Sequence, residues 1–212
     1  MASTENDVRF WDRIARKYAA DPIADMAGYE RTLEETRRYL KTDQAVFEFG
    51  AGTGTTALKL APSVAHLTST DISSEMIAIA RGKAAAEGCS NVTFEVATPD
   101  AAAWPDAAFD VALGFNVLHL VRDRDAVLRG VHRLLKPDGV FISKTPCLKE
   151  MNFMIGLAVP VMRMFGKAPH VAFLSAPEIE REIEEAGFEI IERARHGTRG
   201  KDPRPFLVAR RR

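Results

Sequence analysis

The sequence predicts a doubly wound α/β fold, in which helices cover both faces of a seven-stranded, mostly parallel sheet. From residue 45 to residue 186, short apolar runs alternate with longer segments of helical periodicity, and the joints between them are short. This alternation is typical of parallel strands joined by crossover helices. Two further strand-like runs, 188–194 and 206–210, follow each other without a helix between them. We therefore expect the sheet to end in a C-terminal antiparallel hairpin.

The order of the elements follows from the position of apolar and turn-forming residues. The strands are predicted at 45–49, 65–70, 92–96, 109–115, 140–144, 188–194 and 206–210. The helices between them are predicted at 55–60, 73–87, 123–135 and 176–186. Ser73 is a good helix N-cap and Gly88 a good helix end, while the turn 136–139 stops the following helix.

Two amphipathic helices, 8–20 and 29–40, precede the first strand. In the first, apolar residues recur every three or four positions between charged ones, as in Trp11, Ile14, Ala15 and Tyr18. The expected organisation is an N-terminal helical arm over 1–42, followed by one α/β domain over 43–212. The length of 212 residues suits a single domain with such an arm.

The composition argues against several classes of function. Lys and Arg together number 29, as do Asp and Glu, so no overall field favours nucleic acid or an anionic membrane surface. Cys89 and Cys147 are far apart, without the spacing of a zinc site or a disulfide framework, so no metal site is expected. The start of the chain lacks the apolar run of a signal peptide. We expect a cytoplasmic protein that binds a small molecule.

Three glycines follow the first predicted strand at the place where α/β sheets bind ligands. Gly50, Gly52 and Gly54 allow positive φ and close approach of a ligand to the main chain. The next position is Thr55, so the GxGxxG pattern that cradles a dinucleotide pyrophosphate is not met. There is also no P-loop pattern, so phosphoryl transfer has no support.

Two carboxylates flank this turn and narrow the choice of ligand. Glu48, two residues before the first glycine, would repel a pyrophosphate and attract an amino group. Asp71 ends the second predicted strand, where a carboxylate can accept both hydroxyl groups of a ribose. The alternative role of Asp71 as a helix cap is less favoured, because Ser73 serves that purpose. The expected ligand is cationic at one end and a riboside at the other.

These motifs resemble those of the class I methyltransferases, which use S-adenosyl-L-methionine and have a Rossmann-like fold. The segment Glu48-Phe49-Gly50-Ala51-Gly52-Thr53-Gly54 resembles the family's first motif. The resemblance implies that Asp71 binds the ribose and that Ile72 and Met76 lie near the adenine. Residues 109–112 with 116–119, and residues 134–139, resemble later motifs. The resemblance covers about 45–188 and is closest to the small-molecule methyltransferases of ubiquinone and menaquinone biosynthesis.

The family resemblance implies cofactor contacts at three further positions. In that group an Asp after the third strand meets the adenine amino group, whereas the aligned residue is Thr98, in the segment Ala97-Thr98-Pro99-Asp100. Thr98, with Pro99, is expected at the adenine, with Asp100 or a main-chain group as alternatives. Asn116, after the fourth strand, is expected at the cofactor as well.

Two residues are candidates for a catalytic role. His119 follows the fourth predicted strand and is the candidate base if the nucleophile must lose a proton, with His170 a weaker one. A merely structural histidine is an equally good interpretation of each. Tyr18 is expected either to line the cofactor cleft or to pack against the sheet.

The segment 146–175 is longer and more apolar than an ordinary helix-sheet joint. Its four Met residues and its Phe and Leu residues suggest an adaptable lid over an apolar substrate, although a helical excursion that packs on the core is the alternative. The same surface suits a dimer contact or transient membrane contact, without stable insertion. A monomer and a homodimer are both compatible with this pattern.

The sequence as a whole favours methyl transfer from S-adenosyl-L-methionine to an apolar or amphipathic small molecule. An NAD(P)-dependent reductase is one alternative, disfavoured by the glycine spacing and by Glu48. A non-catalytic, methyltransferase-like binding protein is the other. The scaffold serves O, N, C and S nucleophiles, so the sequence does not identify the acceptor.

Overall fold

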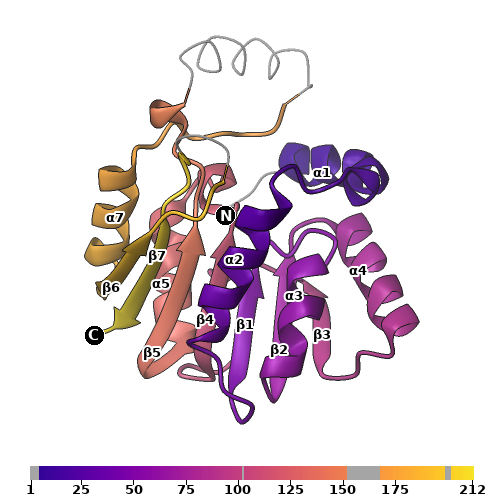
Figure 1. Cartoon of the computed structure of the whole chain (residues 1–212), viewed down its shortest axis with the longest axis horizontal. Helices are drawn as coiled ribbons and strands as arrows, with labels where there is room; N and C mark the ends of the chain where they lie inside the picture. Colours follow the sequence, from indigo (N-terminus) through magenta and orange to yellow (C-terminus); the bar gives the residue numbers. More distant parts are fainter. Residues whose placement is uncertain (1–4, 102, 152–167, 199–201) are drawn as a thin grey trace.

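A computed structural model shows a single seven-stranded sheet with the order β3-β2-β1-β4-β5-β7-β6 (Figure 1). The structure describes residues 5–101, 103–151, 168–198 and 202–212. The first five strands are parallel, whereas β7 is antiparallel to both β5 and β6. The order reverses beside β1, which confirms the doubly wound, Rossmann-like sheet and its C-terminal hairpin.

The strand bounds agree closely with the pattern of apolar runs. The strands are β1 (Ala45–Phe49), β2 (His66–Asp71), β3 (Val92–Val96), β4 (Phe109–Phe115), β5 (Leu135–Lys144), β6 (Phe188–Ala194) and β7 (Phe206–Arg211). The fifth strand begins five residues earlier than expected, at Leu135 instead of Val140. Leu135 pairs with Phe109 and Val140 with Val111, so the residues between them bulge out as the predicted turn.

The helices begin and end at the capping residues that the sequence contains. They are α1 (Glu5–Ala20), α2 (Met26–Arg37), α3 (Thr55–Leu60), α4 (Ser74–Glu87), α5 (Arg124–Leu134) and α7 (Ala176–Glu185). Short 3₁₀ turns lie at η1 (Ala61–Ser63), η2 (Leu118–Leu120) and η3 (Leu148–Glu150). As expected, Ser73 caps α4 by accepting a hydrogen bond from the Met76 N–H, and Gly88 ends it in the left-handed conformation.

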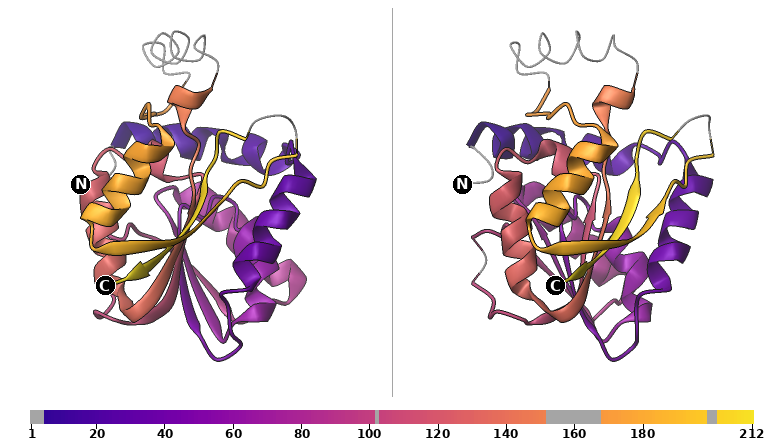
Figure 2. Two further views of the ribbon diagram at one scale, coloured as in Figure 1. Left: turned by 60° about the vertical axis from the view of Figure 1, so that its left-hand side comes forward. Right: turned by 90° about the vertical axis from the view of Figure 1, so that its left-hand side faces the viewer.

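Helices cover the two faces of the sheet in separate groups, as the two views of Figure 2 show. One face packs against α5 and α7, and the other packs against α2, α3 and α4. Successive strand residues point to opposite faces. Phe47 therefore packs on the face covered by α5 and α7, and Val46 packs on the face covered by α2, α3 and α4. Both side chains are fully buried.

Helix α1 lies across the carboxyl ends of the strands and next to α4 (Figures 1 and 2). Asp12 fixes this contact, because its Oδ1 accepts hydrogen bonds from the Ser73 hydroxyl at 2.6 Å and from the Glu75 N–H at 3.2 Å. A second attachment joins Asp7 to Arg122, which precedes α5, through two hydrogen bonds of 2.7 and 3.1 Å. The helix therefore covers the edge of the sheet where ligands of this fold class bind.

No helix among the described residues is long and apolar enough to cross a membrane. The predicted lid at 146–175 lies largely outside the described residues, since 152–167 are not among them. Its described part includes η3, whose Leu148 is buried, and Pro169. The lid, like the division at residue 42, stays a prediction.

Candidate active site

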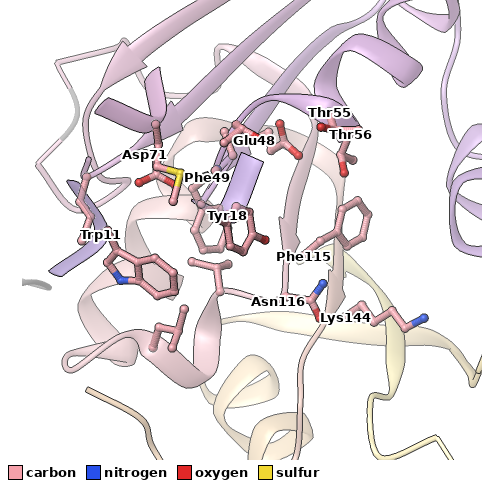
Figure 3. A pocket seen from close by; sticks show the side chains of 18 of the residues that line it. Trp11, Tyr18, Glu48, Phe49, Thr55, Thr56, Asp71, Phe115, Asn116 and Lys144 are labelled. Carbon is pink, nitrogen blue, oxygen red and sulfur yellow. Dashed lines mark hydrogen bonds between the residues drawn. The ribbon is translucent and has the colours of Figure 1, made fainter. Parts of the chain in front are cut away.

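A cavity of about 570 Å³ opens at the carboxyl ends of β1, β2, β4 and β5, beneath α1 (Figure 3). Its walls include residues from the glycine turn, from α1 and α2, and from the ends of β4 and β5. The sequence-predicted cofactor residues that line it are Glu48, Phe49, Gly50, Ala51, Gly52, Asp71, Ile72, Met76, Thr98, Pro99 and Asn116. The tertiary structure thus brings these residues together around one space.

The turn after β1 depends on glycine at positions that line the cavity. Gly50 has φ of +70° and Gly52 has φ of +53°, a region that L side chains rarely adopt. At Gly50 a Cβ atom would also lie 2.6 Å from Cβ of Val117. The glycines therefore bring the main chain into the cavity wall, where no side chain blocks the approach of a ligand.

Gly54, which was predicted at the cofactor, does not line the cavity, and its cofactor contact stays a prediction. It is the N-terminal cap residue of α3, with φ of +76°. A Cβ atom there would lie 2.7 Å from Cβ of Ala80 and 2.8 Å from the ring of Phe94. Gly54 therefore permits close packing of α3 against α4 and β3, and its place in the motif reflects that packing.

Glu48 brings a nearly inaccessible carboxylate to the cavity wall. The residue is 2% exposed, and its Oε2 accepts a hydrogen bond of 2.6 Å from the Ser69 hydroxyl. Burial, and secondarily the negative charge of Asp71, raise the pKa of Glu48 to about 7. A cationic ligand group beside it would relieve this unfavourable desolvation. The arrangement suits a ligand ammonium group.

Asp71 ends β2 with its carboxylate tied to the main chain. Its Oδ2 accepts a hydrogen bond from the Gly52 N–H at 2.8 Å, and its Oδ1 accepts one from the Ser73 N–H at 3.0 Å. Each carboxylate oxygen keeps a further lone pair for a ligand hydroxyl group. Burial and then the charge of Asp12 raise the pKa of Asp71, whereas its main-chain hydrogen bonds lower it. The geometry matches the recognition of two neighbouring hydroxyl groups.

The wall next to Asp71 is mixed apolar and polar. Ile72 and Met76 line it from the start of α4, and Thr98 and Pro99 line it from the loop after β3. Asp100, the alternative to Thr98, does not line the cavity. Of these two side chains only Thr98 lines the cavity, and its contact with the adenine stays a prediction, as does that of a main-chain group.

Helix α1 contributes two aromatic side chains to the cavity. Tyr18 lies between Asp71 on one side of the view and Asn116 on the other, and Trp11 lies on the Asp71 side (Figure 3). The rings of Trp11 and Tyr18 meet edge to face at 6.3 Å. Partial burial and the nearby charge of Asp71 raise the pKa of Tyr18, so its hydroxyl stays protonated at neutral pH. Of the two predicted roles of Tyr18, the cleft-lining one is the one observed.

His119 does not line the cavity, although its neighbour Leu120 does. The three residues of η2 point in three directions, and its first residue, Leu118, is fully buried. Within the described part of the chain, Nδ1 of His119 is buried without a hydrogen-bond partner, and burial lowers the pKa of the imidazole to about 4. This placement weighs against the predicted role of His119 as a base. His170 does not line the cavity either.

Several lining residues were not predicted from the sequence, and most come from outside the motifs. They include Trp11, Tyr29, Thr32, Phe115, Val117, Leu120, Val121, Lys144 and Arg204. For Lys144 a signal existed, since it is a charge at the carboxyl end of a buried parallel strand, the ligand edge of this fold class. Among the described residues, no group of three His, Cys, Asp or Glu side chains is arranged to hold a metal ion.

The fold and the cavity define a doubly wound α/β protein with a ligand site at the carboxyl ends of its strands, and comparison with known proteins gives its family. Residues 23–187 match a methyltransferase domain family. The chain belongs to this family of methyltransferases. The match confirms the resemblance to the class I methyltransferases and the S-adenosyl-L-methionine cofactor inferred from the motifs, and it weighs against the reductase alternative.

Individual relatives agree with this assignment. The uncharacterized methyltransferase YcgJ of Bacillus subtilis is 33% identical over 102 residues, which is 48% of this chain and 40% of that protein. The ubiquinone biosynthesis O-methyltransferase of Sinorhizobium fredii is 25% identical over 180 residues, covering 83% of this chain and 71% of the relative. The region matched in sequence thus spans less than half of the length of YcgJ.

Solved structures share the fold at low sequence identity. The S-adenosylmethionine-dependent methyltransferase from Mesorhizobium loti superimposes with a TM-score of 0.69 at 19% identity. The superposition covers 87% of this chain and 98% of the other. At this identity the likeness shows the architecture alone and does not identify the methyl acceptor.

Proposed function

We propose that this methyltransferase modifies a small molecule that is apolar or amphipathic. The observation that carries the proposal is the composition of the cavity wall, which adds apolar side chains such as Ile23, Phe115, Leu120 and Val121 to the predicted cofactor residues. Apolar walls with a few polar groups are typical of small-molecule sites. The similarity to a ubiquinone biosynthesis O-methyltransferase supports this class of acceptor.

The cofactor residues divide the work of binding between them. Glu48 binds the ammonium group of the methionine part, and Asp71 binds the ribose hydroxyls. Ile72, Met76, Thr98 and Pro99 enclose the adenine, while the turn containing Gly50 and Gly52 brings main-chain groups to the ligand. The residues fit the cofactor, because a buried carboxylate whose pKa is about 7 lies where a cation is expected.

S-adenosyl-L-methionine supplies an electrophilic methyl group on its sulfonium. The protein's contribution is to place the acceptor atom in line with that group and to exclude water. Tyr18, which lies between Asp71 and Asn116, and Asn116, on the side opposite Asp71, position the acceptor (Figure 3). The protonated Tyr18 hydroxyl donates a hydrogen bond in this arrangement.

Isothermal titration with S-adenosyl-L-methionine tests the cofactor site. Asp71→Ala removes two charge-assisted hydrogen bonds to the ribose, so we expect the dissociation constant to rise by about 100-fold or more. Asp43→Ala, at an exposed position before β1, is the control. Unchanged affinity in Asp71→Ala, with a normal melting temperature, would contradict the assignment.

Incubation with cofactor labelled in the methyl group and a cell extract tests the acceptor class. We expect label in a fraction that passes an ultrafiltration membrane and partitions into organic solvent. Label confined to retained protein or nucleic acid would overturn the small-molecule proposal. Cofactor binding without any labelled product in fresh extracts would favour a non-catalytic binding protein.

A further inference from the structure

The cavity contains a buried cation at the end away from the predicted cofactor. Lys144, the last residue of β5, is 5% exposed and lines the cavity. Figure 3 shows Asn116 and Lys144 together on the side opposite Asp71. A buried ammonium group is costly unless it is paired, so its partners indicate what it is there to bind.

The hydrogen bonds around Lys144 hold it in place without using all its donors. Its Nζ donates to Thr32 Oγ1 at 2.9 Å. Thr32 in turn donates its single proton to the Gly28 carbonyl at 2.8 Å, so its oxygen is an acceptor for Lys144. An ammonium group has three N–H donors. Among the described residues, Thr32 is the hydrogen-bond partner of Lys144.

The nearest carboxylate only partly neutralises Lys144. Asp202 Oδ2 lies 3.7 Å from Nζ, an ion pair that is too long for a hydrogen bond. The same carboxylate accepts hydrogen bonds from Arg204 Nε at 2.8 Å and from the Gly197 N–H at 2.7 Å. Asp202 is therefore shared between two cations, and Lys144 keeps donors for a ligand.

Asn116 follows β4 and lies beside the end of β5, near the start of the Lys144 side chain (Figure 3). The main-chain N–H of Asn116 donates to the main-chain carbonyl of Lys144 at 2.7 Å, so the ends of β4 and β5 are held together. Asn116 has φ of +53°, a conformation that Asn tolerates better than most residues. The apolar side chain of Phe115, which also lines the cavity, lies near Asn116 (Figure 3).

We propose that Lys144, with Asn116, is a specificity-determining site for an acidic oxygen, a carboxylate or a phenolate, carried by an apolar acceptor. This inference rests on the proposed function, because it places the acceptor at the end of the cavity that the cofactor leaves free. An anion completes the hydrogen bonding of the buried ammonium group. A neutral hydroxyl at the same place satisfies it less well, since it accepts a hydrogen bond but leaves the charge of the buried ammonium group uncompensated.

Titration of simple probes into the full chain saturated with S-adenosyl-L-homocysteine tests this site. The probes are benzoate and octanoate, each compared with its neutral counterpart, benzyl alcohol or octan-1-ol. We expect each acid to bind about tenfold more tightly than its alcohol, the effect of one charge-assisted hydrogen bond. Equal affinity of acid and alcohol in the wild type would overturn the proposal.

Two substitutions test whether the ammonium group of Lys144, and not the rest of the cavity wall, causes the preference for the acid. Lys144→Met keeps the apolar stem of the side chain. It should abolish the preference for the acid and leave the affinity for S-adenosyl-L-homocysteine unchanged. Lys136→Met, at the exposed amino end of the same strand, is the matched control and should keep the preference. If Lys144→Met retains the preference, Lys144 is not the anion site.

A second variant keeps the test decisive if Lys144→Met does not fold. Asn116→Asp is nearly isosteric at an exposed position and introduces a negative charge beside Lys144. It should weaken benzoate about tenfold more than it weakens benzyl alcohol. An equal effect on both probes would contradict the proposal. Failure of the cofactor analogue to bind the wild type would instead contradict the proposed function, so the two failures are distinct.

Discussion

The two ends of the cavity are built in different ways. At the cofactor end, Glu48 and Asp71 lie on neighbouring strands joined by one short helix, and main-chain groups of the glycine turn complete the wall. At the acceptor end, Thr32, Asn116, Lys144 and Arg204 come from segments far apart in the chain. The cofactor end can therefore be read as a motif, whereas the acceptor end exists only once the sheet has formed.

The largest expected effect comes from the residue that joins the two ends. Gly50→Ala places a methyl group against Val117 at a positive φ, so the cofactor turn and the acceptor wall must both shift. We expect cofactor binding to fall below detection by titration calorimetry. Gly82→Ala in α4, which meets nothing within 4 Å, should bind normally and melt at the same or a slightly higher temperature. Tight binding by Gly50→Ala would show that the turn is adaptable.

Gly54→Ala should separate packing from ligand contact within the same motif. The added methyl group meets Ala80 and Phe94 in the core, so we expect a loss of about 1–3 kcal/mol in unfolding free energy. Because Gly54 does not line the cavity, the folded fraction should keep most of its cofactor affinity. Urea denaturation and titration calorimetry measure the two effects. If Gly54→Ala is as stable as the wild type but no longer binds the cofactor, Gly54 contacts the cofactor as first predicted.

Weakening the attachment of α1 should have a smaller effect, which concerns both the cofactor end and the acceptor end of the cavity. Arg122→Met breaks the paired hydrogen bonds to the buried Asp7, so α1, which carries Trp11 and Tyr18, is held less firmly over the cavity. We expect the cofactor to dissociate about tenfold faster in stopped-flow measurements. Arg129→Met removes an exposed ion pair on α5 and should leave the rate unchanged. Equal rates in both variants would show that α1 does not retain the cofactor.

The smallest expected effect is the release of a proton from Glu48 when the cofactor binds. Burial raises its pKa to about 7, above that of the unfolded chain, so this carboxyl contributes stability below pH 4.5 that is lost as the pH rises to about 7. A cofactor ammonium group beside it lowers the pKa again. We therefore expect release of about half a proton on binding at pH 7, measured by calorimetry in phosphate and Tris buffers.

Glu48→Gln should remove both the proton release and this part of the pH dependence of stability. The exposed Glu34→Gln, on α2, is the matched control and should behave as the wild type. Proton release that persists in Glu48→Gln would assign the titrating group elsewhere, with Asp71 the next candidate because its pKa is raised too.

The order and bounds of the elements were largely present in the sequence. The strands β1, β3, β4 and β6 and the helix α3 begin and end where the apolar pattern predicts. This succeeds because buried strands need continuous apolar runs and because helices end at identifiable caps. The extension of β5 to Leu135 was missed, since the bulge between Leu135 and Val140 contains the turn residues that indicate an end.

By itself the sequence determined the class of enzyme and the cofactor end, because backbone conformation and carboxylate spacing there depend on residues close together in the chain. Only the tertiary structure decided that Gly54 packs in the core, that His119 does not line the cavity and that Lys144 does. These outcomes depend on which face of a turn or strand meets the cavity. That is set by how α1, β4 and β5 pack together across long separations in sequence, which local periodicity does not encode.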